Sequence, residues 1–242
     1  MAQRKVLITG GSGGIGRAIA ARLTQDAYQV VNLDRVKPKT LEPNEQYIEV
    51  DLLDAAATGA VLQDLAEQGD VLRVVNNAGF IRPATLDDTT VEDFQAVIAL
   101  NMPAPILVTQ TLLPAMRRAQ FGRVINIASR AALGKELRTA YSASKAGLIG
   151  MARTWALEGA ADGVTVNVIG PGPIATELFL SGNPPESPKT KRILESIPVR
   201  RMGTPEDIAH AVSSLIDDRA GFITGQVLYV CGGMTVGLSH TA

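Results

Sequence analysis

The sequence is poor in the residues that form disulfides and metal centres. It contains one cysteine, Cys231, which rules out an internal disulfide bond. It contains two histidines, His210 and His240, so we expect no metal-ligand cluster. Cys231 lies beside two glycines after an apolar run and is interpreted as a packed apolar residue without a role. The predicted chemistry therefore uses neither a disulfide nor a metal.

An excess of charge of either sign is also absent. Lys and Arg total 23 against 24 Asp and Glu, and the formal net charge is −1. Nothing in this balance indicates a nucleic-acid partner or an anionic membrane surface. The first residues, MAQRKVLITGG, contain no apolar run long enough for a signal peptide or a membrane span. We therefore expect a cytoplasmic protein with a small-molecule partner, no nucleic acid and no membrane.

Short β-rich runs alternate along the chain with longer segments of helical period, which is the pattern of βαβ units around a parallel sheet. The length of 242 residues suits one domain spanning 1–242. The prediction is an α/β protein, a doubly wound Rossmann fold with a seven-stranded parallel sheet flanked by helices. The expected strands are Val6–Thr9, Gln29–Asp34, Gln46–Asp51, Val71–Asn76, Arg123–Ser129, Val164–Ile169 and Gln226–Val230. The expected helices are Ile15–Asp26, Asp54–Glu67, Val91–Arg118, Ala140–Ala161 and Pro205–Ile216.

One segment, 176–201, interrupts this alternation. It carries a glycine and four prolines around a short polar stretch that predicts one helix. Long connections of this kind are often functional. We expect a mobile flap that closes over a ligand.

A glycine-rich loop follows the first predicted strand and opens the first predicted helix. It reads Thr9-Gly10-Gly11-Ser12-Gly13-Gly14-Ile15-Gly16 and satisfies G-x-G-x-x-G. Missing side chains let a pyrophosphate approach the backbone at the positive end of the helix. An acidic residue, Asp34, ends the second strand about 20 residues later, where it suits a ribose hydroxyl pair. These features predict a dinucleotide site.

Asp34 also bears on the choice of dinucleotide. A carboxylate accepts hydrogen bonds from a free 2′-hydroxyl but repels the 2′-phosphate of NADP, so we expect NAD as the cofactor. Arg35 follows immediately and can be read either as a phosphate partner or as a solvated arginine at a strand end. Asp51 and Leu52, after the third strand, are expected near the adenine. A carboxylate that caps the helix beginning near Asp54 explains Asp51 nearly as well.

The predicted chemistry depends on three residues in the second half of the chain. Ser129 ends the fifth predicted strand, and ligands of open parallel sheets bind beyond the carboxyl ends of the strands. Tyr141 and Lys145 stand four positions apart on a predicted helix, so they share one face. A tyrosine has an ordinary pKa near ~10, and a nearby ammonium lowers it by favouring the phenolate. We therefore predict Tyr141 as the acid/base of the reaction.

These pieces together resemble the short-chain dehydrogenase/reductase family in its compact form, over nearly the whole chain. The matching residues are the glycine loop, Asn76 through Gly79, Asn101, Ser129, Tyr141 with Lys145, and Pro171, Gly172 and Thr176. The resemblance implies a hydride transfer between NAD(H) and a secondary alcohol or ketone. It also implies a homotetramer. Members that use NADP often carry Arg or Lys just before the middle glycine of the loop, where this chain has Gly13, and this again favours NAD.

The resemblance also implies a role for each matching residue. Tyr141 exchanges the proton and Ser129 binds the substrate oxygen, while Lys145 holds the nicotinamide ribose and tunes Tyr141. Asn101 supports a water molecule beside Lys145, although an asparagine before Met-Pro in a helix can also accommodate a kink. The remaining cofactor contacts are expected from Asn77, Ala78 and Gly79 along the ribose and from Pro171, Gly172, Ile174 and Thr176 at the carboxamide. Turn formation explains these residue types equally well.

The substrate is less constrained than the cofactor. Arg130, Lys135 and Arg138 flank the catalytic residues and can be read as partners of an anionic substrate or as solvated loop cations. One alternative enzyme is an NADPH-dependent 3-oxoacyl carrier-protein reductase. An alternative of another class is a nicotinamide-sensing or scaffold protein without turnover, for which intact Ser129, Tyr141 and Lys145 are hard to explain. A sugar epimerase or dehydratase of the extended branch needs a longer C-terminal region.

Overall fold

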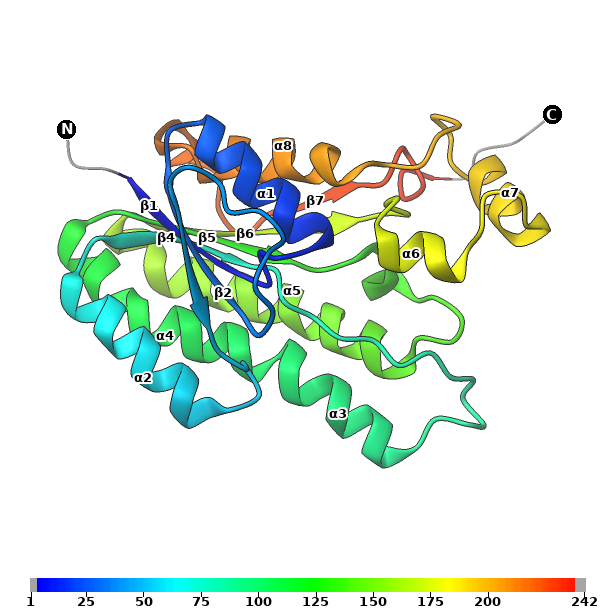
Figure 1. The fold of residues 1–242 in the computed structure, drawn as a ribbon, viewed down its shortest axis with the longest axis horizontal. Coiled ribbons are helices and arrows are strands. Elements are labelled where there is room, and N and C mark those ends of the chain that lie inside the picture. Colours follow the sequence, from blue (N-terminus) through cyan, green and yellow to red (C-terminus); the bar gives the residue numbers. More distant parts are fainter. Residues whose placement is uncertain (1–3, 238–242) are drawn as a thin grey trace.

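The computed structural model describes residues 4–237, and its strands form one seven-stranded parallel sheet in the order β3-β2-β1-β4-β5-β6-β7. This order reverses direction between β1 and β4, which is the switch point where open α/β sheets bind their ligands. The predicted doubly wound Rossmann fold is therefore confirmed (Figure 1). The strands are β1 Lys5–Thr9, β2 Gln29–Asp34, β3 Glu45–Glu49, β4 Val71–Asn76, β5 Gly122–Ile127, β6 Val164–Pro171 and β7 Val227–Val230.

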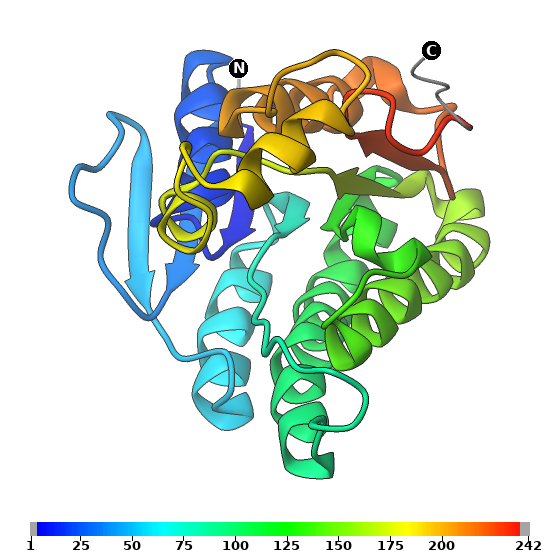
Figure 2. The ribbon, with the colours of Figure 1, turned by 90° about the vertical axis from the view of Figure 1, so that its right-hand side faces the viewer.

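Helices cover both faces of the sheet. Figures 1 and 2 show α1 and α8 on one face and α2, α4 and α5 on the other, with α6 and α7 beyond one end of the sheet. The α-helices are α1 Gly14–Gln25, α2 Ala55–Gln68, α3 Val91–Asn101, α4 Pro103–Ala119, α5 Thr139–Gly159, α6 Glu177–Gly182, α7 Pro188–Glu195 and α8 Pro205–Ile216. Short 3₁₀ turns lie at η1 Arg130–Leu133, η2 Ala160–Asp162 and η3 Asp218–Ala220.

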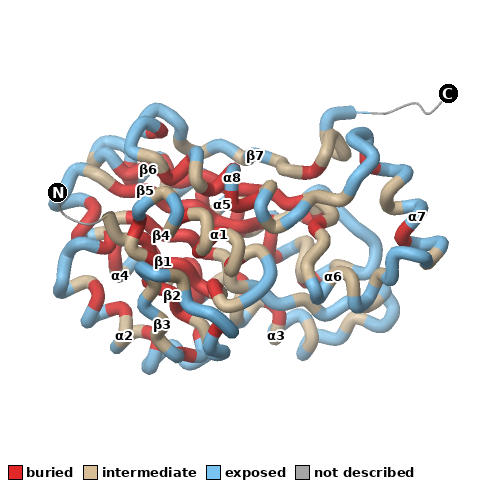
Figure 3. The backbone as a smooth tube through the Cα atoms, turned by 45° about the horizontal axis from the view of Figure 1, so that its top comes forward, coloured by how far each residue is buried: buried red, intermediate tan, exposed pale blue. Residues whose placement is uncertain are grey.

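Two apolar cores hold these layers together, one on each face of the sheet. On β1, Leu7 faces the core under α2 and α4, whereas Val6 and Ile8 face the core under α1 and α8. All three side chains are fully buried. Figure 3 shows the same concentration of buried residues along the central strands. Strands covered on both faces explain the continuous apolar runs of the sequence.

The long helix expected at Val91–Arg118 is two helices. The chain breaks at Met102, whose φ and ψ are −116° and −54°, because Pro103 lacks an N–H and crowds the residue before it. By length and composition alone, the combined segment Val91–Ala119 could cross a membrane. Its apolar residues include Val97, Val108 and Leu112, which are fully buried in this fold. Packing inside the chain therefore accounts for part of the apolar character, since 39% of the apolar window is buried and Phe94 and Ile106 stay exposed.

Other boundaries differ from expectation in ways that affect the site. The third strand ends at Glu49 instead of Asp51, and Asp51 lies in the turn before α2. The fifth strand ends at Ile127, so Ser129 lies two residues beyond it. The segment 176–201 contains two helices instead of one, since Ser187 caps a second helix that starts at Pro188.

Candidate active site

The loop between β1 and α1 exposes its backbone on one side. Gly10 and Gly14 have φ values of +68° and +50°, in the region that favours glycine. A Cβ at Gly16 would lie 2.0 Å from the carbonyl oxygen of Gly10, so only glycine fits there. A Cβ at Gly13 would meet nothing within 4 Å. This open side, together with the unpaired N–H groups that begin a helix, fits the pyrophosphate of a dinucleotide.

Residues after β4 fix the inner side of this loop. The Asn77 Nδ2 atom donates to the carbonyl oxygens of Thr9 and Gly10 at 3.0 and 2.9 Å. The Thr9 hydroxyl accepts from the backbone N–H groups of Asn77 and Ala78 at 3.0 and 3.1 Å. A Cβ at Gly79 would lie 3.3 Å from the Nζ atom of Lys145. The stretch 77–79 therefore connects the glycine loop with the predicted catalytic lysine.

The carboxylate of Asp34 is engaged within the protein. Its two oxygens accept from the backbone N–H groups of Ser12 at 3.0 Å and Val36 at 3.2 Å. Arg35, directly after it, is exposed. Asp51 accepts from the N–H of Leu53, while the Leu52 side chain is buried in the core. The residue that caps α2 is Asp54, whose side chain accepts from the N–H of Ala57. Asp51, the other candidate for this cap, lies three residues earlier.

The expected carboxamide contacts lie at the end of β6. Pro171 is the last residue of the strand, and Gly172 donates its N–H to the Val230 carbonyl at 2.9 Å. Ile174 is buried and forms an isolated parallel β-bridge with Gly203. Thr176 caps α6 by accepting from Phe179 N–H. The methyl group of Thr176 would lie 3.5 Å from a Cβ at Gly14, so the start of the segment 176–201 lies beside the glycine loop.

Ser129 and Tyr141 come together where β5 ends and α5 begins. The Ser129 hydroxyl caps η1 by accepting from Ala131 N–H at 3.1 Å. Burial raises the pKa of Tyr141 above its ordinary value, and a hydrogen bond with the Ser129 side chain and the charge of Arg138 offset part of this rise. The phenol is thus held in its protonated form at neutral pH, next to the serine hydroxyl.

Lys145 is 3% exposed and donates from Nζ to the Ile127 carbonyl at 2.7 Å. Burial lowers its pKa to about 8. Its Nζ atom lies 5.6 Å from the centre of the Tyr141 ring. The expected lowering of the Tyr141 pKa by this ammonium is not what the structure shows: the contributions that lower this pKa come from Ser129 and Arg138, and burial outweighs them, so the net shift is upward.

Asn101 is held at the break between α3 and α4, where its side chain is 1% exposed. It accepts from the N–H of Phe80 at 2.8 Å and donates to the Phe80 carbonyl and to the Ser144 hydroxyl, both at 3.0 Å. Ser144 in turn donates to the Tyr141 carbonyl at 2.8 Å. No sequence pattern singles out Ser144, because its partner Asn101 is 43 residues away.

Four cations gather beside the catalytic residues. Arg138 lies close enough to Tyr141 to lower the pKa of its phenol. Partial burial, followed by the charges of Arg138, Arg130 and Lys189, lowers the pKa of Lys135. Three of these residues were candidates from the sequence. Lys189 was not, because only the fold brings α7 toward the loop after β5.

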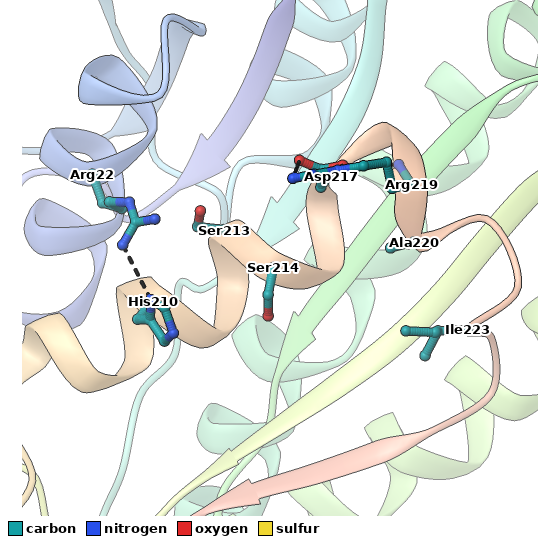
Figure 4. Close-up of a pocket in the computed structure, with 8 residues that line it drawn as sticks. All are labelled: Arg22, His210, Ser213, Ser214, Asp217, Arg219, Ala220 and Ile223. Carbon is teal, nitrogen blue, oxygen red and sulfur yellow. Dashed lines mark hydrogen bonds and ion pairs between the residues drawn. The ribbon is translucent and has the colours of Figure 1, made fainter.

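A separate hollow of about 380 Å³ lies between α1 and α8, and its lining includes none of these residues (Figure 4). Its polar groups bind one another: Arg22 contacts His210, and Asp217 pairs with Arg219. We assign this hollow no catalytic role. Within residues 4–237, no three His, Cys, Asp or Glu side chains are grouped so as to hold a metal, and His240 lies outside that range.

Comparison with known proteins gives consistent matches over nearly the whole chain. The family model described as enoyl-(acyl carrier protein) reductase matches residues 10–235. Acetoacetyl-CoA reductase of Rhizobium meliloti is 38% identical over 237 residues, which cover 95% of this chain and 98% of the relative. The 3-oxoacyl-(acyl-carrier-protein) reductase MabA of Mycobacterium avium is 39% identical, with 97% and 91% covered. The crystal structure of a putative 2-deoxy-d-gluconate 3-dehydrogenase from Agrobacterium tumefaciens is 32% identical, with 97% of each chain covered and a TM-score of 0.90.

The Agrobacterium tumefaciens structure contains bound NADP, as do two further structures of similar fold. The expected preference for NAD over NADP is therefore wrong. The expectation treated Asp34 as a free carboxylate that repels a phosphate. In the structure, Asp34 already accepts two backbone N–H groups, and the exposed cations Arg35, Lys37 and Lys39 follow it.

Proposed function

This chain belongs to the short-chain dehydrogenase/reductase family of oxidoreductases, and we propose on that basis that it reduces the 3-oxo group of an acyl thioester with NADPH. The observation that carries the proposal is the convergence of Ser129, Tyr141 and Lys145 beside an open glycine loop. The substrate class is supported by the similarity to acetoacetyl-CoA reductase and to MabA. The product is the corresponding 3-hydroxyacyl thioester.

Each catalytic side chain has a distinct part in this reaction. Bound NADPH supplies the hydride to the carbonyl carbon. Burial keeps the phenol of Tyr141 protonated, and this phenol donates its proton to the carbonyl oxygen. The Ser129 hydroxyl binds the same oxygen and orients it. Lys145 binds the nicotinamide ribose, and Asn101 supports a water molecule through which the proton on Tyr141 is replaced.

The 2′-phosphate of NADP(H) is bound by the basic residues after β2. Arg35 follows the strand directly, and Lys37 and Lys39 lie in the same exposed loop. An arginine can bind a phosphate through two parallel hydrogen bonds, whereas a lysine contributes a point charge. Asp34 keeps the start of the loop in place through its two backbone contacts.

A steady-state assay of NADPH consumption tests the proposed function. We expect turnover of acetoacetyl-CoA with NADPH, at a kcat/KM at least about tenfold above that with NADH, which corresponds to roughly one phosphate contact. Turnover with NADH alone, or with neither cofactor, would contradict the proposal. A protein without turnover that still bound NADPH would instead belong to the nicotinamide-sensing class.

The cations near Tyr141 predict that the substrate is anionic. In acyl-CoA or an acyl carrier protein, the anionic groups are phosphates that the pantetheine arm separates from the thioester, so we propose that they meet these cations at the outer edge of the site and not at the Tyr141 phenol itself. We expect Arg130→Ala to raise the KM for acetoacetyl-CoA about tenfold, as loss of one charge-assisted hydrogen bond does, and to leave kcat nearly unchanged. The neutral N-acetylcysteamine thioester should be reduced equally by both proteins. Arg118→Ala, at the far end of α4, is the matched control. Equal changes for both thioesters would contradict the prediction.

We further propose that the chain works as a cytoplasmic homotetramer, as the family resemblance implies. Large apolar side chains at two separate places support an assembly, because they reach the surface of the single chain. Leu157 on α5 is 83% exposed, and Phe222 before β7 is 103% exposed. Apolar side chains exposed to this degree gain from burial against another subunit.

A further inference from the structure

The glycine loop is tied to the sheet through a buried carboxylate that the proposed reaction does not use. Glu45, at the start of β3, has a fully buried side chain. Its carboxylate accepts from two guanidinium nitrogens of Arg17 at 3.0 and 2.6 Å and from the Asn32 amide at 3.0 Å. The backbone N–H of Glu42 adds a fourth donor at 2.9 Å. A carboxylate with four donors is satisfied and fixed in direction.

Asn32 passes this constraint to the loop. Its Oδ1 atom accepts from the N–H of Gly11 at 2.9 Å, and its Nδ2 atom donates to the Ser12 hydroxyl at 3.2 Å as well as to Glu45. The reversed amide would point its oxygen at the Glu45 carboxylate, so Glu45 selects the orientation that serves Gly11. A Cβ at Gly11 would lie 2.6 Å from Asn32 Oδ1, which shows how closely the amide approaches the loop.

Arg17 extends the same network to the loop after β2. This residue lies in the first turn of α1, and its guanidinium also approaches the Thr40 carbonyl at 3.5 Å and the Glu42 carboxylate at 3.8 Å. The loop that carries Arg35 is therefore held at both ends, by Asp34 at its start and by Arg17 near its end. The glycine loop and the loop after β2 are thus both linked to the Glu45 carboxylate, the first through Asn32 and the second through Arg17.

We propose that Glu45 is a positioning residue for the cofactor: through Asn32 and Arg17 it holds the glycine loop and the basic loop in their phosphate-binding shapes before the cofactor arrives. The inference rests on the proposed use of NADP(H). A loop rich in glycine has many conformations, and the entropy lost in ordering it weakens binding unless the protein has already ordered it. Glu45 does not touch the cofactor in this arrangement and acts through its two partners.

Fluorescence titration of NADPH into wild-type protein and Glu45→Gln tests this role. The variant loses the charge and one acceptor, so we expect the Kd for NADPH to rise about tenfold. The kcat at saturating NADPH should stay within about twofold, because the catalytic residues are untouched. Glu45→Asp keeps the charge and should recover part of the affinity. Glu42→Gln removes a carboxylate that also approaches Arg17 but not Asn32, and its Kd should stay within about twofold.

A double-mutant cycle shows whether Glu45 acts through Asn32. We expect Asn32→Ala to weaken NADPH binding and the double variant with Glu45→Gln to bind no more weakly than the poorer single variant. Additive effects, or a Glu45→Gln protein with wild-type affinity, would overturn the inference and leave the proposed function standing. A wild-type protein that bound no NADPH would overturn both. If Glu45→Gln fails to fold, Arg17→Met combined with Glu45→Leu leaves no unpaired buried charge and carries the same expected loss of affinity.

Discussion

Replacing Tyr141 with phenylalanine is expected to lower the rate of reduction of the 3-oxo group about a thousandfold and to leave the Kd for NADPH within about twofold of the wild-type value. The substitution removes one hydroxyl group from a side chain that otherwise keeps its place in the first turn of α5. The Ser129 hydroxyl then still binds the carbonyl oxygen, but no proton reaches that oxygen as charge develops on it. Rate measurements under saturating substrate, together with NADPH titration, check both parts.

The direction of the Tyr141 pKa shift adds a pH dependence to this prediction. Burial raises this pKa, so the phenol stays protonated through the neutral range. Reduction needs the protonated form and should lose rate only as the pH rises through the raised pKa, whereas oxidation of the 3-hydroxyacyl product should gain rate over the same range. Tyr141→Phe should remove this dependence from whatever activity remains.

A second tyrosine variant provides the control. Tyr229→Phe removes a phenolic hydroxyl from β7, where the ring packs against Gly170, and should keep wild-type turnover. A Tyr141→Phe protein with more than about a tenth of the wild-type rate would show that another group donates the proton. A wild-type protein as inactive as the variant, yet able to bind NADPH, would favour the non-catalytic class.

The parts of the fold that could be predicted depend on local patterns. The glycine loop, the continuous apolar runs of β1 and β5 and the four-residue spacing of Tyr141 and Lys145 are all readable within a short window of sequence. Boundaries were less accurate because backbone pairing decides them. The fifth strand stops at Ile127 since pairing with β6 ends there, although the apolar pattern continues to Ala128.

The parts that could not be predicted depend on contacts between distant residues. Ser144 meets Asn101, and Glu45 meets Arg17, only after the chain has folded. The error about the cofactor has the same origin. The sequence places an aspartate at the end of β2, but the atoms that occupy its oxygens come from Ser12 and Val36. A residue type at a motif position therefore did not reveal whether its charge was free to act on a ligand.

Lys145 offers a prediction in which activity and stability change in opposite directions. Lys145→Met should lower the rate of reduction by at least about a hundredfold, because the ribose loses its partner. The same variant should be more stable at neutral pH. Burial lowers the pKa of Lys145 to about 8, and an ordinary lysine value near ~10.4 makes this a cost of roughly 3 kcal/mol to the folded state. The lost hydrogen bond to Ile127 offsets about 1–2 kcal/mol, so we expect a net gain of about 1–2 kcal/mol.

The pH dependence of stability distinguishes this cost from a packing effect. The unfolded chain binds the Lys145 proton more tightly than the folded protein, so the cost is fully present below about pH 8 and falls away as the pH rises toward ~10.4. The stability advantage of Lys145→Met should therefore shrink across this window in denaturant unfolding measured at several pH values. Lys189→Met, at an exposed position on α7, should show no such trend. A Lys145→Met protein that is less stable than wild type at neutral pH would show that the contact with Ile127 outweighs the burial of the charge. A constant difference between the two proteins would mean that the ammonium does not lose its proton in the folded state over this range.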